Sequence, residues 1–290
     1  MKISVASGKG GTGKTTIATN LAVAIGRMGK TVAYLDCDVE EPNGHLFLKP
    51  EIKEQIDVTV PVPRVDLDKC TLCGDCSAAC EYHAIAVLGK TVEVFDSLCH
   101  GCGGCLDVCP EDAIEEIPRT IGQINRGVGM GVEFLEGRLN VGEAISPPVT
   151  KALRKLGTTS SVVIIDAPPG TSCPVIEAIK DTDFVILITE PTPFGLNDLK
   201  LAVGMVREIG LSYGVVINRS DIGDSRTHEY CRQEKIDILM NIPFDRQVAE
   251  TYSRGDMMLD VNSQYDKNLY DLYQIIAERV NHDGTDRSQR

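Results

Sequence analysis

A glycine-rich segment near the start of the chain, residues 7–16, constrains the fold more than any other feature. It reads Ser7-Gly-Lys-Gly-Gly-Thr-Gly-Lys-Thr-Thr16. The apolar run at residues 3–6 predicts a buried strand before it, and the pattern of residues 14–28 predicts a helix after it. A strand that leads through such a turn into a helix surrounds a phosphate with backbone N–H groups and a helix N-terminus. The segment therefore predicts a phosphate-binding α/β domain.

The same segment matches the phosphate-loop pattern Gly-x-x-x-x-Gly-Lys-[Ser/Thr] at positions 8–15. In this pattern the backbone cradles the phosphates, Lys14 reaches the terminal ones, and the Thr15 hydroxyl binds Mg²⁺. The residues expected to contact the nucleotide are Gly8, Lys9, Gly10, Gly11, Thr12, Gly13, Lys14, Thr15 and Thr16.

Acidic residues end two further apolar runs that predict buried strands. Residues 31–36 end in Asp36, which Asp38 follows closely, and residues 161–166 end in Asp166. Ligand-binding residues of open parallel sheets lie at such strand ends. We expect the Asp166 carboxylate to hold Mg²⁺ through water. Plain solvation is the alternative for Asp36 and Asp38.

Eight of the 11 cysteines lie between residues 61 and 118 and form a repeat. Each half reads Cys-x2-Cys-x2-Cys-x3-Cys, and each cysteine of the second half lies 29 residues after its counterpart. This is the spacing of bacterial ferredoxins, in which the fourth cysteine of each half binds the other cluster. We expect two [4Fe-4S] clusters, one on Cys70, Cys73, Cys76 and Cys109 and the other on Cys80, Cys99, Cys102 and Cys105. Zinc, which also binds Cys-x2-Cys pairs, is the alternative metal.

The cysteine repeat interrupts the α/β pattern, so the phosphate-binding domain is predicted to be split. Residues 1–59 and 119–280 form its two parts, residues 60–118 an inserted ferredoxin-like α+β domain, and residues 281–290 a polar tail. In the second part we expect strands within 120–139 and at 184–189, 213–217 and 236–242, and helices at 146–156, 174–182, 199–209 and 265–280. Residues 190–198 are expected to be a loop. The predicted fold is a mainly parallel α/β sheet flanked by helices.

Composition limits the class of protein further. The net charge is -13 and no cluster of Lys and Arg occurs, which argues against nucleic-acid binding. There is no readable secretory signal and no apolar run long enough to span a membrane. The predicted last helix carries Asp266, Asp271 and Glu278, which argues against attachment to a membrane surface. We expect a cytoplasmic protein, in which cysteines serve as metal ligands more readily than as disulfides.

Two segments resemble a known superfamily. The loop from Gly8 to Thr16 and the run Asp166-Ala-Pro-Pro-Gly170 are similar to the deviant phosphate loop and the switch of MinD, ParA and Mrp proteins, to which the nitrogenase iron protein is related. The resemblance implies a Mg²⁺-dependent ATPase that binds ATP and ADP and forms a homodimer on binding ATP. It also implies that Lys9 reaches the phosphates of the partner subunit.

The resemblance assigns further roles. Asp38 positions the attacking water, Asp36 is an outer-shell partner of Mg²⁺, and Gly170 senses the terminal phosphate. Asn218 contacts adenine, and the backbone at Pro243 flanks the base.

Cys173 stands seven residues after Asp166, before the predicted helix at 174–182. A cysteine at a similar offset in the nitrogenase iron protein helps two subunits share one cluster, so Cys173 is a candidate ligand for a cluster or metal at a dimer interface. A second cysteine to match that protein has no clear counterpart here, and inert packing at a helix start is the alternative.

The leading hypothesis is an ATPase whose nucleotide-gated dimer couples ATP turnover to electron transfer, or to metallocluster assembly and insertion in an unknown protein partner. A redox-sensing positioning or regulatory ATPase is the alternative, although we find no basic or amphipathic binding face. A ferredoxin with a vestigial ATPase half is weaker still, because every catalytic position is filled.

Overall fold

The computed structural model describes the backbone of residues 1–287 and the side chains of residues 1–282. In this part of the chain, a nine-stranded sheet has the order β11-β10-β9-β1-β8-β2-β7-β6-β3. Its strands are β1 (Lys2–Ala6), β2 (Val32–Asp36), β3 (Glu51–Val65), β6 (Ile114–Gly129), β7 (Val132–Leu139), β8 (Val162–Asp166), β9 (Phe184–Thr189), β10 (Tyr213–Asn218) and β11 (Ile238–Ile242). The strands from β11 to β7 are parallel, whereas β6 is antiparallel to β7 and β3. The predicted α/β fold with a mostly parallel sheet is confirmed.

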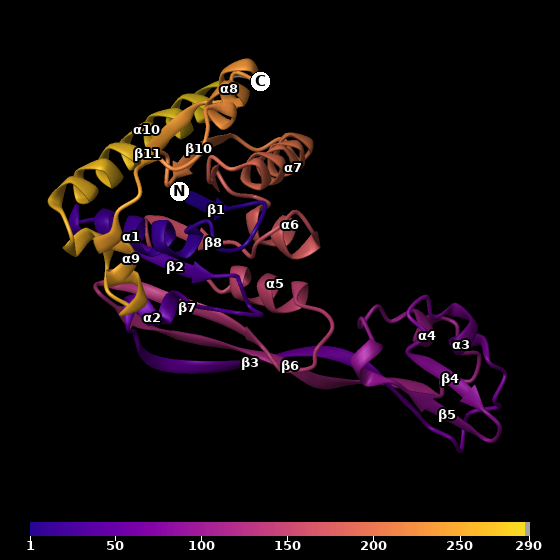
Figure 1. The fold of residues 1–290 in the computed structure, drawn as a ribbon. Coiled ribbons are helices and arrows are strands. Elements are labelled where there is room, and N and C mark those ends of the chain that lie inside the picture. Colours follow the sequence, from indigo (N-terminus) through magenta and orange to yellow (C-terminus); the bar gives the residue numbers. More distant parts are fainter. Residues whose placement is uncertain (288–290) are drawn as a thin grey trace.

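Helices cover both faces of this sheet (Figure 1). One face carries α1 (Lys14–Arg27), α2 (Gly44–Leu48) and α10 (Ser263–Arg287), and the other carries α5 (Pro147–Lys155), α6 (Cys173–Ile179), α7 (Pro193–Ile209) and α8 (Arg226–Gln233). Side chains of a strand alternate between faces, so Ile164 packs into the core under α1 while Ile165 packs into the core under α7. Burial on both faces explains why these strands are continuous apolar runs in the sequence.

Strands β3 and β6 extend beyond the sheet as a two-stranded ribbon (Figure 1). Pairing of β6 with β7 stops at Gly122, whereas pairing with β3 continues to Ile114 opposite Val65. Residues 66–113 form a separate lobe at the far end, which we call the cysteine lobe. It contains α3 (Asp75–Ala79), β4 (Ile85–Leu88), β5 (Thr91–Val94), the 3-10 helix η1 (Asp96–Leu98) and α4 (Gly104–Asp107).

Several elements differ from the sequence predictions. Residues 193–198 are helical, not a loop, because α7 begins at Pro193 and the Thr192 hydroxyl caps it by accepting the N–H of Gly195 at 3.0 Å. Helix α10 starts at Ser263 and continues through Arg287, which places most of the predicted polar tail in a helix; residues 288–290 lie outside the described chain. The helices α2, α8 and α9 (Arg246–Ser253) were not predicted.

Candidate nucleotide site and cysteine lobe

The predicted phosphate loop joins β1 to α1 and forms a tight turn. Gly11 and Gly13 have φ angles of 77° and 95°, a region that favours glycine. A Cβ on Gly13 would lie 2.7 Å from Nδ2 of Asn218, which donates to the Thr12 carbonyl at 2.9 Å. Asn218, at the end of β10, thus holds the loop in place. Position 13 requires glycine, because any other residue would bring its Cβ too close to Asn218.

A cavity of about 380 Å³ opens in front of this loop. Nine residues predicted to bind nucleotide or act on it line the cavity: Gly10, Gly11, Gly13, Lys14, Thr15, Thr16, Asp38, Asn218 and Pro243. The aromatic residues Phe244, Tyr252 and Tyr265 line its wall as well, and the two tyrosines were not predicted. A motif search could not find the two tyrosines, because they are brought there by α9 and α10 from far along the chain.

Asp166 provides the best test of whether Mg²⁺ fits this site. Its side chain is fully buried, and Oδ2 accepts a hydrogen bond from the Tyr34 hydroxyl at 2.9 Å. Oδ1 has no hydrogen-bond partner in the described chain. Burial raises the pKa of Asp166, and the nearby charge of Lys14 opposes that rise. A buried carboxylate oxygen beside Lys14 and Thr15 is the hard oxygen donor that Mg²⁺ prefers, directly or through water, so these residues fit the ion.

Asp38 differs from Asp166 because it is only partly buried and lines the cavity. Burial raises its pKa to about 6, against the opposing effect of Lys14. A carboxylate with this pKa is ionised at neutral pH and can accept a hydrogen bond from a water molecule in the cavity. This geometry fits the role predicted for Asp38, which stays a prediction.

Asp36 is fully buried and does not line the cavity. Its Oδ1 accepts the N–H of Asp38 at 3.2 Å, and its Oδ2 accepts those of Asn43 and Gly44 at 3.1 and 2.8 Å. Burial raises the pKa of Asp36 well above its usual range, and the charge of Asp166 raises it further. Asp36 thus fixes the loop that carries Asp38, and its role toward Mg²⁺ stays a prediction.

The remaining predicted residues contact other parts of the same chain. Gly8 packs so tightly that an added Cβ would lie 2.3 Å from the Asp198 carbonyl. Nζ of Lys9 lies 3.7 Å from Oε2 of Glu190. Gly170 donates its N–H to the Ser7 carbonyl at 2.9 Å. The Asn218 side chain holds the loop as described above. Contacts of these residues with a nucleotide or a second subunit stay predictions.

The cysteine lobe brings the eight repeat cysteines together in two groups of four. One small cavity is lined by Cys70, Cys73, Cys76 and Cys109, and a second by Cys80, Cys99, Cys102 and Cys105. These are the two sets that the sequence spacing predicts. In the described chain, no group of three or more His, Cys, Asp or Glu side chains converges closely enough to hold a single metal ion. Both [4Fe-4S] clusters and zinc bind four cysteines, so the metal held by these two sets stays a prediction.

The backbone of the lobe repeats along with its cysteines. Leu72 and Gly101, 29 positions apart, have φ angles of 60° and 63°, and each donates its N–H to a cysteine sulfur at 3.4 Å. Ala84 and Ala113, also 29 positions apart, donate to Cys80 and Cys109 at 3.3 Å. Amide hydrogen bonds to sulfur stabilise thiolate ligands and help to set the potential of a cluster.

Cys173 is exposed at the first residue of α6, and no described cysteine forms a disulfide with it. Cys37 and Cys231 are buried, and burial raises the pKa of both thiols. These two cysteines pack as apolar residues.

A mostly parallel sheet, a glycine loop leading into a helix, and two aspartates at neighbouring strand ends define a P-loop nucleotide-binding protein. The family model of the CobQ/CobB/MinD/ParA nucleotide binding domain matches residues 3–259. The chain therefore belongs to this family of nucleotide-binding ATPases.

Individual relatives agree with this assignment. An uncharacterized protein of Methanocaldococcus jannaschii is 32% identical over 282 residues, which cover 97% of this chain and 98% of the relative. An iron-sulfur cluster carrier protein of Pyrococcus horikoshii is 26% identical over 279 residues, covering 88% and 77%. The solved structure of the septum site-determining protein MinD complexed with Mg-ADP, also from Pyrococcus horikoshii, has a TM-score of 0.55 at 23% identity, covering 93% of each chain. This last likeness shows a common fold.

The described helices include none that combines the length and the apolar character needed to cross a bilayer.

Proposed function

We propose that this ATPase couples its nucleotide cycle to two [4Fe-4S] clusters in the cysteine lobe, either for electron transfer to a partner protein or for metallocluster assembly and insertion in one. The observation that carries the proposal is the gathering of eight cysteines into two sets of four around two cavities. The bound clusters supply one-electron chemistry. The similarity to an iron-sulfur cluster carrier protein over most of the chain supports the same class of function.

In the nucleotide site, Lys14 and Thr15 hold the phosphates and Mg²⁺ of ATP, and Asp166 holds Mg²⁺ through water. Asp38 orients the attacking water from its partly buried position on the cavity wall. The Mg-ADP found in the related MinD structure supports this assignment of the ligand. Lys9 completes the site of a second subunit, so that ATP binding produces a homodimer.

The ribbon formed by β3 and β6 supplies the physical link between the two parts. Both strands belong to the sheet that carries the nucleotide site, and both extend to the edge of the cysteine lobe, with a register shift between Val58 and Thr59. The paired strands therefore connect the sheet that carries the nucleotide site to the cysteine lobe.

Iron and sulfide analysis after anaerobic reconstitution tests the proposal. The wild-type chain is expected to bind about eight iron atoms, and Cys76→Ser and Cys105→Ser are each expected to lose about four, because each variant removes a ligand of one cluster. Cys173→Ser is the matched control outside the lobe and should retain all eight. Binding of zinc in place of iron, or an unchanged iron content in both lobe variants, would contradict the proposal. A loss of iron in Cys173→Ser would instead show that this residue binds a cluster.

A further inference from the structure

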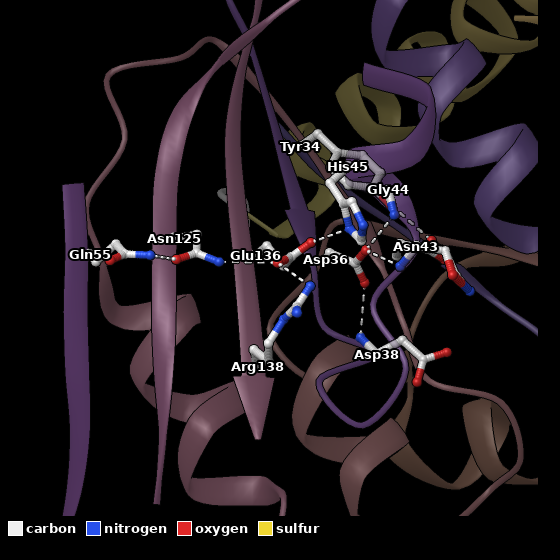
Figure 2. Close-up of polar contacts among 11 residues, drawn as sticks. Tyr34, Asp36, Asp38, Asn43, Gly44, His45, Gln55, Asn125, Glu136 and Arg138 are labelled. Atoms are coloured by element: carbon white, nitrogen blue, oxygen red, sulfur yellow. Dashed lines mark hydrogen bonds and ion pairs between the residues drawn. The ribbon is translucent and has the colours of Figure 1, made fainter. Parts of the chain in front are cut away.

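A chain of polar contacts leads from the nucleotide site toward the ribbon (Figure 2). It starts at Asp36, which accepts the N–H groups of Asn43 and Gly44 at the N-terminal end of α2. Asn43 lines the nucleotide cavity. The next residue of α2, His45, places Nδ1 2.7 Å from Oε2 of Glu136 on β7. Helix α2 is thus held between the nucleotide site and the sheet.

From Glu136 the contacts cross the two outer strands. Asn125 of β6 donates its Nδ2–H to Glu136 Oε1 at 3.2 Å, and Gln55 of β3 donates its Nε2–H to Asn125 Oδ1 at 3.0 Å. Figure 2 shows these three side chains in a row across the neighbouring strands. Glu136 is only 2% exposed, and Arg138 also donates to it at 3.3 Å. A buried carboxylate that loses its donors is costly, so the groups bonded to Glu136 move together with it.

Tyr34 ties the same helix to the Mg²⁺ site. Its hydroxyl donates to Oδ2 of Asp166. A Cβ on Gly44 would lie 2.5 Å from the Tyr34 hydroxyl oxygen, which shows how closely the start of α2 packs on this ring. Asp166, Asp36 and α2 therefore have little freedom to shift independently of one another.

We propose that His45, Glu136, Asn125 and Gln55 form a relay that transmits the nucleotide state from the Asp36–Asp38 segment to the ribbon, and so to the cysteine lobe. The inference rests on the proposed function, since it names the route of the coupling. The relay residues do not line the nucleotide cavity and act as positioning residues. Binding of Mg-ATP shifts the loop around Asn43, α2 follows, and Glu136 passes the shift to Asn125 and Gln55.

The ribbon is suited to carry such a shift, because β3 and β6 are paired from Glu51 opposite Val128 to Val65 opposite Ile114. Gln55 and Asn125 lie near the sheet end of this pairing, and the cysteine lobe lies at the other end (Figure 1). The register shifts once between this rung and the lobe, between Val58 and Thr59, and the pairing then continues to Val65. A displacement applied at this rung therefore reaches the lobe along both strands.

Amide hydrogen exchange tests the relay in the full-length, anaerobically reconstituted protein with and without Mg²⁺ and the ATP analogue AMPPNP. In the wild type we expect the nucleotide to change exchange in residues 58–65 and 114–121, the part of the ribbon beyond β7. Asn125→Ala cuts the relay between Glu136 and β3, and it should reduce this nucleotide-dependent change about fivefold or more. Gln55→Ala, at an exposed position, should also reduce the nucleotide-dependent change in exchange.

The matched control is Gln123→Ala. Gln123 donates to Asp57 at 3.0 Å and forms the next rung between β6 and β3 on the same face, without a bond to Glu136. It should retain the wild-type response. A merely structural role of Asn125 would alter exchange equally with and without nucleotide, leaving the difference intact. If the wild type and Asn125→Ala respond alike, the relay is wrong and the proposed function stands. If the wild-type ribbon does not respond to nucleotide, both the relay and the proposed coupling are overturned.

Discussion

Asp38 and Asp166 lie close together in the nucleotide site, yet their surroundings give them different chemistry. Asp166 is fully buried with one unpartnered oxygen, which suits a cation. Asp38 lines the cavity with a pKa of about 6, which suits contact with water. The sequence predicts different roles for the two residues, and their different surroundings in the fold suit that difference.

The pKa of Asp38 predicts how ATP hydrolysis depends on pH. The working form is the carboxylate, and because its pKa is raised to about 6, kcat/KM should fall as the pH drops through about 6 and level off above it. Steady-state rates at saturating Mg²⁺ measure this profile.

Asp38→Asn supplies the control for that profile. It should lower the rate by about 10²–10⁴-fold and abolish the step near pH 6, while ATP still binds. A variant that hydrolyses ATP at the wild-type rate would remove Asp38 from the mechanism.

Two glycines allow the packing at the start of α2 to be tested. Gly44→Ala would bring a methyl group to 2.5 Å from Tyr34, so we expect a loss of about 1–3 kcal/mol in the free energy of unfolding. Gly26→Ala in α1 meets only Val132 at 4.0 Å and should gain about 0.5–1 kcal/mol, because alanine favours a helix. Urea unfolding monitored by circular dichroism measures both. Equal stabilities of the two variants would show that the Tyr34 side chain can move aside at little cost in free energy.

Asp36 illustrates why side-chain roles are hard to predict from a motif. Its place at the end of β2 was predictable, but two of its three partners are backbone N–H groups at the start of the five-residue helix α2, those of its N-cap Asn43 and of Gly44, and this helix has no clear signal in the sequence. The orientation of the carboxylate follows from that helix. Tyr34, two residues earlier in the same strand, was not predicted to belong to the site, because its partner Asp166 is distant in the chain.

At the scale of elements, the ribbon is the feature that sequence reasoning missed. Val58, Val60 and Val62 are buried and alternate as in a strand. Pro61 and Pro63 break the sequence signal of this strand, and the predicted domain boundary at residues 59 and 60 falls within it. Proline is tolerated in β3 because this strand lies at the edge of the sheet and has β6 as its neighbour. The predicted boundaries meet across the ribbon, where Pro61 pairs with Pro118.

An ion pair lies where the ribbon leaves the sheet. Arg119 of β6 donates through both terminal nitrogens to Glu143, at 2.5 and 2.9 Å, and the two side chains are 19% and 11% exposed. Glu143→Gln should cost about 1–3 kcal/mol in the free energy of unfolding, because a shielded charged hydrogen bond is lost. Chemical denaturation measures this change.

The exposed pair of Arg246 and Glu250 is the matched comparison for this ion pair. Its side chains are 85% and 54% exposed, so Glu250→Gln should cost less than about 0.5 kcal/mol. Equal losses of stability in Glu143→Gln and Glu250→Gln would contradict a larger contribution of the shielded ion pair.

The whole molecule has two parts, the nucleotide-binding domain and the cysteine lobe. The change from α/β alternation to the cysteine repeat predicts this division from the sequence. The two cysteine sets were predictable because each half carries the Cys-x2-Cys-x2-Cys-x3-Cys spacing of ferredoxins, in which the fourth cysteine belongs to the other set. The extended placement of the lobe on a ribbon was not, since it depends on how far β3 and β6 remain paired beyond β7.

This architecture predicts that the lobe can be removed. Val65 and Ile114 are directly paired, so replacing residues 66–113 by Asn-Gly should close the ribbon as a two-residue hairpin. The shortened chain should fold and bind ATP but no iron, as measured by calorimetry and metal analysis. Failure to fold would mean that the sheet depends on the lobe.

The central claim, that the clusters and the nucleotide site are coupled, is tested most directly by measuring the Kd for ATP in the oxidised and in the chemically reduced holoprotein. Coupling free energies are reciprocal, so reduction should change the Kd by about fivefold or more. The chain without the lobe should give the same Kd under both conditions. Identical affinities in the oxidised and reduced full-length protein would contradict the account.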